Sequence, residues 1–349
     1  MAGASETIQH GLSEHSHGFG VPIQTRSERV KSTKLADFAE ISTREEQWRY
    51  IGSSELGGLD KVGLDEFSGD ITAITAEGVE TSWIESDHPL FGLAGIPEDR
   101  VSAAGWEAAK AAYLISVSKD SNPELPSRIQ IQSIVSDPSA LHVVVHAAKH
   151  SKSTIVIEHS GDAVLSENIE VIVEDEANLT LVSIQEWNTK SIHSSAQFAK
   201  LGRNSKFKHV VVSLGGSVVR VTPSAYFGAA GGDVELYGLY FADADQYLEH
   251  RIFVDHSEPN CKSRVTYKGA LQGDKAHTVW VGDVLIRAEA EGTDTYELNR
   301  NLLLTDGARA DSVPNLEIET GQIQGAGHAS ASGRFDDEQL FYLQARGID

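Results

Sequence analysis

The sequence predicts a mainly β protein, with a mixed α/β region before the β-rich core and one short helix after it. Short runs in which apolar residues alternate with polar ones follow one another from about Ser127, as in Ile169–Val173. Gly, Asn and Asp residues separate these runs. No helix-length pattern interrupts this stretch for roughly 190 residues, which excludes a doubly wound α/β fold.

A regular alternation of strand and turn is compatible with a sandwich, a barrel or a parallel β-helix. The β-helix is favoured because the stretch is long for one sandwich or barrel, whereas a solenoid has no upper limit on length. Single Asn or Gly residues in the turns also suit corners between coils better than two-residue hairpin turns. Because no strict repeat motif is present, the pattern alone leaves all three architectures open.

The regions before the core are predicted from their composition. Residues 1–34 are polar and aperiodic and predict a flexible tail, whose positive residues Arg26, Arg29, Lys31 and Lys34 we expect to be solvated. Residues 35–126 form a mixed region with two predicted helices. They are Leu35–Tyr50, with Thr43–Glu46 as a capping box, and Ser102–Ser116, which is rich in Ala and Leu-type helix formers.

The core is predicted over residues 127–332 and consists of short strands. These predicted strands are Ile129–Ile134, Leu141–Val145, Thr154–Ile157, Ile169–Val173, Leu179–Ile184, Phe207–Leu214, Val218–Thr222, Val234–Phe241, Tyr247–Val254, Arg264–Leu271 and His277–Ile286. Turns are predicted between them, for example at Gly161-Asp162, Gly202–Asn204 and Gly215-Gly216.

Residues 333–349 begin a C-terminal helical segment, in which Arg334–Gly347 predicts a helix. Asp336 is a good N-cap with Gln339 at the capping-box position, and Gly347 suits the left-handed position after the helix. Asp337 and Glu338 suit the positive start of the helix. These roles account for three carboxylates that could otherwise be taken for the acid pair of a glycoside hydrolase.

Composition restricts the partners and the compartment. The chain has 29 Lys and Arg residues against 51 Asp and Glu residues, and its formal charge of −22 disfavours nucleic acid and anionic membranes as partners. The single cysteine, Cys261, allows no internal disulfide and no cluster or zinc site held by several thiolates of this chain. There is neither a secretory h-region nor an apolar run of the roughly 20 residues that cross a bilayer, so we expect a cytoplasmic protein.

Several histidines are candidate metal ligands by their spacing. His142, His146, His150 and His159 have suggestive spacing, but Val143–Val145 indicates a strand and no carboxylate stands at a suitable spacing, so we expect surface or packing roles. His10, His15 and His17 belong to the predicted tail. We expect Cys261 to be a buried, inert thiol at a coil corner. Phosphate-loop and hydrolase motifs are absent, so ATP hydrolysis would belong to a partner.

Several segments resemble the SufB/SufD family of iron–sulfur cluster assembly proteins and point to its SufD branch. They are Arg44–Arg49, Asp255-His256, Tyr267–Gly269, Asn299–Leu304, Pro314–Ile318, and Gly327-His328 running into Gly333–Leu343, whose Gly-Arg-Phe-Asp-Asp-Glu-Gln-Leu-Phe-Tyr-Leu string is the most specific. The resemblance implies a right-handed parallel β-helix with helical segments at both ends. It also implies a non-catalytic scaffold subunit that pairs with a SufB-like subunit, in a complex driven by a SufC-like ATPase.

The resemblance places the cluster at the interface of the two subunits and the implicated histidine on His328. Imidazole is a good ligand for iron, so His328 would complete a site for a transient iron–sulfur cluster whose thiolates come from the partner. The SufB branch has a Cys where Asn299 stands, which favours SufD. A Cys that SufD proteins can carry two residues before the histidine is replaced by Ala326.

The helices with which the family docks SufC follow the Arg-Gly-Ile of residues 346–348 and are missing here, so either the chain is truncated or SufC docking is compromised. The unpaired terminal edge of a β-helix must be capped or paired, so a homodimer through this edge is an alternative when the sister subunit is absent. Two alternatives remain: a carbohydrate-active β-helix enzyme, or an interaction module that has lost cluster chemistry.

Overall fold

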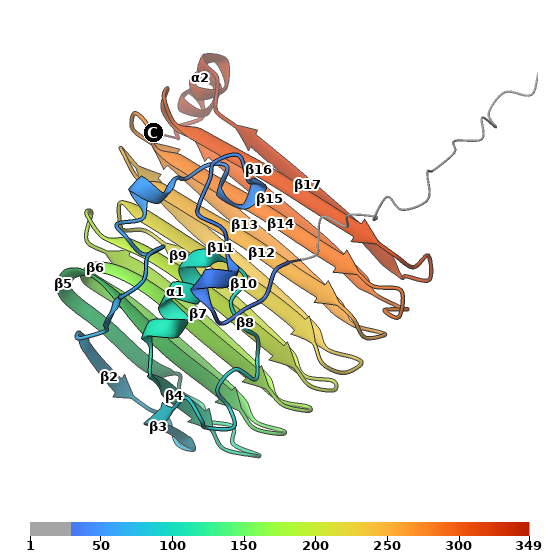
Figure 1. Ribbon diagram of the computed structural model, residues 1–349. Coiled ribbons are helices and arrows are strands. Elements are labelled where there is room, and N and C mark those ends of the chain that lie inside the picture. Colours follow the sequence, from blue (N-terminus) through green and yellow to red (C-terminus); the bar gives the residue numbers. More distant parts are fainter. Residues whose placement is uncertain (1–28, 349) are drawn as a thin grey trace, which may run out of the picture.

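The strands from β6 onward pair in parallel, each with the strand two places later in the chain. In the computed structural model, which describes residues 29–348, Leu165 of β6 pairs with His193 of β8, and Lys262 of β13 pairs with Asp294 of β15. The chain therefore advances by about 28 to 32 residues per coil. This is the pattern of a parallel β-helix, which confirms the predicted fold class and removes the sandwich and the barrel (Figure 1).

Two faces of parallel strands enclose the lumen of the β-helix. The first face contains β7, β9, β11, β13, β15 and β17, and the second contains β8, β10, β12, β14 and β16. The bounds of these strands are β7 Asn178–Trp187, β8 Ile192–Leu201, β9 Lys206–Ser213, β10 Val218–Phe227, β11 Asp233–Asp243, β12 Tyr247–His256, β13 Lys262–Gln272, β14 His277–Ile286, β15 Asp294–Leu303, β16 Arg309–Ile318 and β17 Gly325–Gly333.

The first two core strands are longer than predicted, because each runs through both faces. β5 (Ser127–Ala147) joins two predicted strands, and β6 (Lys152–Val173) joins two more. The turn predicted at Gly161-Asp162 is thus a corner inside β6, which continues through it as one strand. Gly161 has φ +90°, and a Cβ at this position would overlap the carbonyl oxygen of Ser133 in the coil below, so only glycine fits.

Alternate residues of the strands fill the lumen with one continuous apolar core. β7 shows the alternation, since Leu179 and Leu181 are fully buried and the residues between them are partly exposed. The corners use left-handed residues as predicted, including Asn204 (φ 52°) and Asn260 (φ 59°). Asparagine tolerates this conformation better than other side chains that carry a Cβ.

Antiparallel strands close one end of the β-helix. β2 (Asp70–Ile74) pairs with the first half of β5, and β3 (Val79–Glu85) pairs with β4 (Ala111–Val117), which pairs in parallel with β5. The short β1 (Asp65–Glu66) also pairs with β5. At the other end, β16 and β17 pair only with β14 and β15 among the described residues.

The N-terminal region covers the outer surface of the second face (Figure 1). α1 (Arg100–Ala108) begins at the N-cap Asp99 and packs on β5, β6 and β8. The predicted helix Ser102–Ser116 is therefore wrong in its second half, where Ala111 to Ser116 lie in β4. Pairing with β3 and β5 overrides the helix propensity of these residues.

The helix predicted over Leu35–Tyr50 is also wrong. The segment contains two short 3₁₀ turns, η1 (Leu35–Asp37) and η2 (Glu46–Trp48), and a third, η3 (Ser53–Glu55), follows. Thr43 and Glu46 form no capping box, because Glu45 is the residue before η2. Trp48 is buried in a cluster with Val101 of α1 and packs against Val218 of the β-helix. The turn η1, which contains the buried Leu35, contacts α1, so tertiary contacts determine this conformation.

The C-terminal helix α2 (Asp337–Ala345) agrees with the prediction. Asp336 caps it and accepts a hydrogen bond from the backbone N–H of Gln339, whose side chain accepts from the backbone N–H of Asp336. Gly347 has φ +83°, the left-handed conformation expected after the helix. Neither α1 nor α2 is long and apolar enough to span a membrane.

Candidate functional site

The predicted site residue His328 lies in β17, the last strand of the first face. It pairs in register with Glu297 of β15, in the coil before. Paired residues of parallel strands point to the same side of the sheet, so His328 shares the lumen side on which Glu297 lies. Glu297 is 1% exposed, whereas His328 is exposed because no further coil of the described residues covers it.

Glu297 is a feature that the sequence analysis missed. Neither carboxyl oxygen of Glu297 has a hydrogen-bond partner in the described part of the chain. Burial, together with the nearby charge of Asp283, raises the pKa of Glu297 to about 8. A neutral carboxyl group therefore sits one coil beneath His328, where its O–H is available as a donor.

Asn299 is fully buried in a polar network. Its Nδ2 donates to the Tyr240 hydroxyl (2.9 Å), and its Oδ1 accepts from Asn301 Nδ2 (2.8 Å) and from Ser312 Oγ (2.7 Å). Asn301 Nδ2 also reaches Ser332 Oγ in the last coil at 3.1 Å. The network connects the buried lumen to the last coil and fixes the amide of Asn299 in a structural role.

Ala326 occupies the lumen side of β17, two residues before His328, and packs against the core.

Cys261 is fully buried at the corner before β13, with its Sγ 3.6 Å from the carbonyl oxygen of Pro259 and 3.7 Å from that of Ala229. This position confirms the prediction of a buried thiol. Burial also raises the pKa of the thiol, which lowers its reactivity.

The four core histidines all have carboxylate neighbours, so the expectation that none stands at a suitable spacing is wrong. His142, His146, His150 and His159 have a nitrogen within 3.4 Å of a carboxylate oxygen of Glu170, Glu174, Glu176 and Glu167, respectively. For the first two pairs the partner is 28 residues away, one coil further along the chain. The spacing along the sequence could not reveal these pairs.

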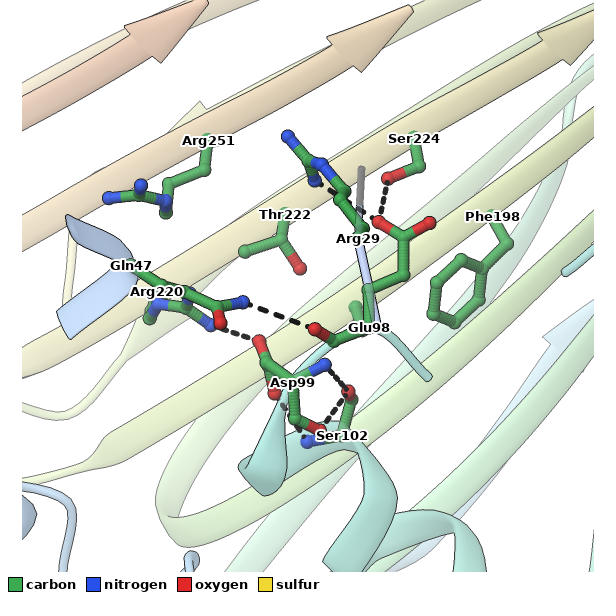
Figure 2. Close-up of a pocket in the computed structure, with 11 residues that line it drawn as sticks. Arg29, Gln47, Glu98, Asp99, Ser102, Phe198, Arg220, Thr222, Ser224 and Arg251 are labelled. Atoms are coloured by element: carbon green, nitrogen blue, oxygen red, sulfur yellow. Dashed lines mark hydrogen bonds and ion pairs between the residues drawn. The ribbon is translucent and has the colours of Figure 1, made fainter. Parts of the chain in front are cut away.

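A polar pocket lies between the N-terminal segment and the second face (Figure 2). Arg29 donates to Glu98 (3.1 Å) and Asp283 (2.9 Å), and Arg220 donates to Asp99 (2.5 Å). The pocket volume of ≈ 20 Å³ accommodates about one water molecule, and its charges are paired with each other, so it anchors the segment and is too small for a substrate.

Two residues of the predicted tail take part in this anchoring. Arg29 pairs with Glu98, and Lys31 lies 3.0 Å from the same carboxylate. The expectation of a solvated side chain is therefore wrong for Arg29, whereas Lys31 stays 39% exposed while it pairs with Glu98. The buried carboxylate of Glu98 requires such cationic partners. Arg26 and the three tail histidines lie outside the described residues.

The fold and this end define the class of the protein: a parallel β-helix that is closed at one end and presents a histidine in an uncovered coil at the other. Residues 131–349 match the family described as SUF system FeS cluster assembly, SufBD core domain. The chain belongs to the SufBD family of iron–sulfur cluster assembly proteins.

The chain is similar to relatives along most of its length. It is 50% identical over 313 residues to an iron–sulfur cluster assembly SufBD family protein of Mycobacterium tuberculosis, covering 87% of this chain and 79% of the relative. It is 48% identical over 315 residues to a protein of the same description from Mycobacterium leprae, covering 87% and 80%. Similarity to the iron–sulfur cluster assembly protein SufD of Escherichia coli is 32% identity over 136 residues, covering 39% of this chain and 32% of that protein.

Proposed function

We propose that this protein is a SufD-type scaffold subunit without catalytic activity of its own, working in the cytoplasm. It pairs with a SufB-like subunit and shares with it a nascent, transient iron–sulfur cluster. ATP enters the cycle only through a SufC-like partner. The observation that carries the proposal is the position of His328 in the uncovered last coil, in register with buried Glu297.

The uncovered end supports pairing with a second β-helix. β16 and β17 each have a strand partner on one side only among the described residues, and an open strand edge promotes pairing with another chain. Large apolar side chains are exposed near this end on β16, after β15 and on α2. They include Leu304, Ile318, Leu340, Phe341 and Tyr342. A related coil would cover this apolar surface and complete the backbone hydrogen bonds of the edge.

The chemistry at this end supports a site completed by the partner. His328 offers one imidazole, Ala326 offers no ligand, and Cys261 is buried in the corner before β13. One imidazole binds a cluster only when thiolates are supplied from elsewhere, and a sister subunit would supply them. The neutral carboxyl group of Glu297 would donate a hydrogen bond to a sulfide or thiolate held near His328, and such hydrogen bonds tune iron–sulfur clusters.

The test is anaerobic co-expression of this chain with a SufB-like and a SufC-like protein, followed by affinity purification and measurement of each subunit, iron and sulfide. We expect the SufB-like subunit to co-purify with bound iron and sulfide. His328→Asn should abolish most of the bound iron and sulfide without loss of the partner. The matched control His150→Asn alters an exposed histidine near the opposite end of the β-helix and should have no effect.

Other outcomes would redirect the assignment. A partner that co-purifies with iron and sulfide unaffected by His328→Asn would favour an interaction module without cluster chemistry. A homodimer through the same end, formed only without the SufB-like subunit, would agree with the proposal. A monomer that captures neither partner would contradict it, and turnover of acidic polysaccharides would then test the carbohydrate-active alternative.

A further inference from the structure

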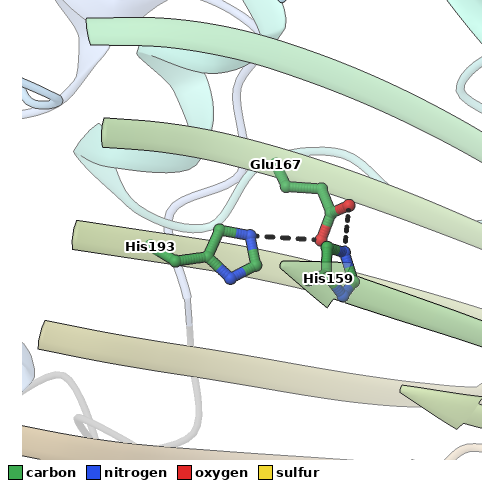
Figure 3. Close-up of side chains that lie close together, drawn as sticks. All are labelled: His159, Glu167 and His193. Atoms are coloured by element: carbon green, nitrogen blue, oxygen red, sulfur yellow. Dashed lines mark hydrogen bonds and ion pairs between the residues drawn. The ribbon is translucent and has the colours of Figure 1, made fainter. Parts of the chain in front are cut away.

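Three side chains capable of binding a metal meet inside the lumen, several coils away from His328 (Figure 3). His159 lies in the first half of β6, Glu167 in its second half beyond the Gly161 corner, and His193 in β8 of the next coil. All three are fully buried. His159 Nε2 is 2.9 Å from Glu167 Oε1, and His193 Nε2 is 3.4 Å from Glu167 Oε2.

The outer nitrogen of each imidazole ring is committed as a hydrogen-bond donor. His159 Nδ1 lies 3.1 Å from the carbonyl oxygen of Ile184, which can only accept, so Nδ1 carries a proton. His193 Nδ1 lies 2.8 Å from Gln185 Oε1. That atom also accepts from Trp187 Nε1, a group that only donates, which identifies it as the amide oxygen.

With Nδ1 protonated, a neutral ring at either position directs its Nε2 lone pair at the carboxylate of Glu167. His193 Nε2 has no hydrogen-bond partner among the described residues. A proton on His159 would satisfy one of the two contacts and leave the other as two facing acceptors in a dry interior, an arrangement that costs free energy.

A divalent cation would satisfy all three groups at once. The candidate ligand atoms lie within 4.8 Å of one another. Zinc–ligand distances of about 2.0 to 2.2 Å place neighbouring ligand atoms of a tetrahedral site roughly 3.3 Å apart. The two distances between imidazole nitrogen and carboxylate oxygen, 2.9 and 3.4 Å, are close to this value. Two histidines and one carboxylate form a known ligand set for Zn²⁺ and for non-haem Fe²⁺.

The neighbouring residues hold the three side chains in orientations that suit metal ligands. Ile184 and Gln185 orient the two rings through their Nδ1 protons, and Ser195 Oγ donates to Glu167 Oε2 at 2.7 Å. Such outer hydrogen bonds fix the tautomer and position of metal ligands. The similar buried pair His142–Glu170 lacks this arrangement. Glu170 accepts hydrogen bonds from the backbone N–H groups of Gly92 and Ala94. No second imidazole approaches Glu170 among the described residues.

We propose that His159, Glu167 and His193 form a buried site for a divalent transition-metal ion of the Zn²⁺ or Fe²⁺ class, which ties together both faces of the lumen and two successive coils. The site is separate from the cluster chemistry proposed for His328, and its ion would be a resident structural one. Its existence does not depend on the proposed function.

The test uses the full chain with His10, His15 and His17 replaced by serine, so that the histidines of the N-terminal segment cannot bind metal. After treatment with a chelator, the protein is titrated with Zn²⁺, and the bound ion is counted after dialysis; Co²⁺ reports the geometry by its absorption. We expect one Zn²⁺ per chain and a rise in melting temperature. Glu167→Gln and His193→Gln should each weaken Zn²⁺ binding by more than about 100-fold, and Ser195→Ala by about 10-fold.

Two controls keep the result interpretable. Glu170→Gln removes a carboxylate from the pair that lacks a second histidine, and His328→Asn removes the proposed cluster ligand; both should retain the Zn²⁺. Ser195→Ala is a small change that serves if the ligand variants do not fold. The proposal is overturned if the chain retains no Zn²⁺ after dialysis, or if Ser195→Ala and Glu170→Gln bind it equally well.

Discussion

Glu297 of β15 and His328 of β17 pair in register across the last two coils, one fully inside the lumen and the other uncovered. Burial raises the pKa of the lower residue, Glu297, to about 8, so it carries a proton at neutral pH. The predicted ligand His328 therefore lies next to a carboxyl group with a raised pKa, and the sequence gives no sign of this pairing.

Replacing Glu297 by glutamine should flatten the dependence of stability on pH. In the unfolded chain the carboxyl group ionises near pH 4.5, whereas in the native protein it keeps its proton up to about pH 8. The native state therefore binds more protons in this window, and the free energy of unfolding falls as pH rises, by about 5 kcal/mol in total. Chemical denaturation from pH 5 to 9 checks this: a slope unchanged in Glu297→Gln would refute it.

Replacing His209 by leucine should remove part of the sensitivity to acid. Burial lowers the pKa of His209 to about 4, and neither ring nitrogen has a hydrogen-bond partner among the described residues. As pH falls from about 6.5 to 4, only the unfolded chain binds a proton at this residue. The free energy of unfolding therefore falls by about 3 kcal/mol. We expect His209→Leu to be more stable than the parent at pH 5 in a urea titration, and a less stable variant would contradict this account.

Arg220 should be critical for the attachment of the N-terminal region. It is 1% exposed, donates to Asp99 at the start of α1 and lies 4.3 Å from the centre of the Trp48 ring. Arg220→Met leaves the buried Asp99 without its cation and should cost about 3 to 5 kcal/mol. Limited proteolysis should then cleave between residues 35 and 64. The control Arg128→Met breaks an exposed pair with Glu158 and should cost less than about 1 kcal/mol.

Gly269 should tolerate no side chain. A Cβ there would overlap the ring of Tyr240, whose hydroxyl donates to Asn301 at 2.5 Å and accepts from Asn299. Gly269→Ala should displace the ring and cost about 1 to 3 kcal/mol, measured by thermal unfolding. Gly333→Ala is the matched control, because no atom lies within 4 Å of its Cβ position. Equal melting temperatures for the two variants would disprove the crowding.

The sequence predicted what depends on local pattern. Alternation located most of the strands of the core, and Asn and Gly located corners such as Asn204 and Asn260. Asp336 and Gln339 predicted the capping of α2, because a capping box is a contact between residues three apart. The helices predicted over Leu35–Tyr50 and in the second half of Ser102–Ser116 are wrong, because tertiary packing there overrides helix propensity.

Contacts between coils could not be predicted in the same way. The coil length changes from about 28 to 32 residues along the chain, so the partner of a given residue cannot be read from a fixed spacing. The pairing of His142 with Glu170 and the convergence of His159 and His193 on Glu167 both depend on this register. The resemblance indicated His328, but its neighbour Glu297 became visible only in the structure.

The antiparallel strands at the start of the β-helix limit how many copies can join. A rod with two matching ends would polymerise into a fibre, since each added copy would expose a fresh end. Here β2 is only five residues long, begins at Asp70 and runs against β5, so this end does not match the parallel strands at the other. If the proposed pairing through β16 and β17 occurs, growth would therefore stop after one partner, and the assembly would be a pair of finite length.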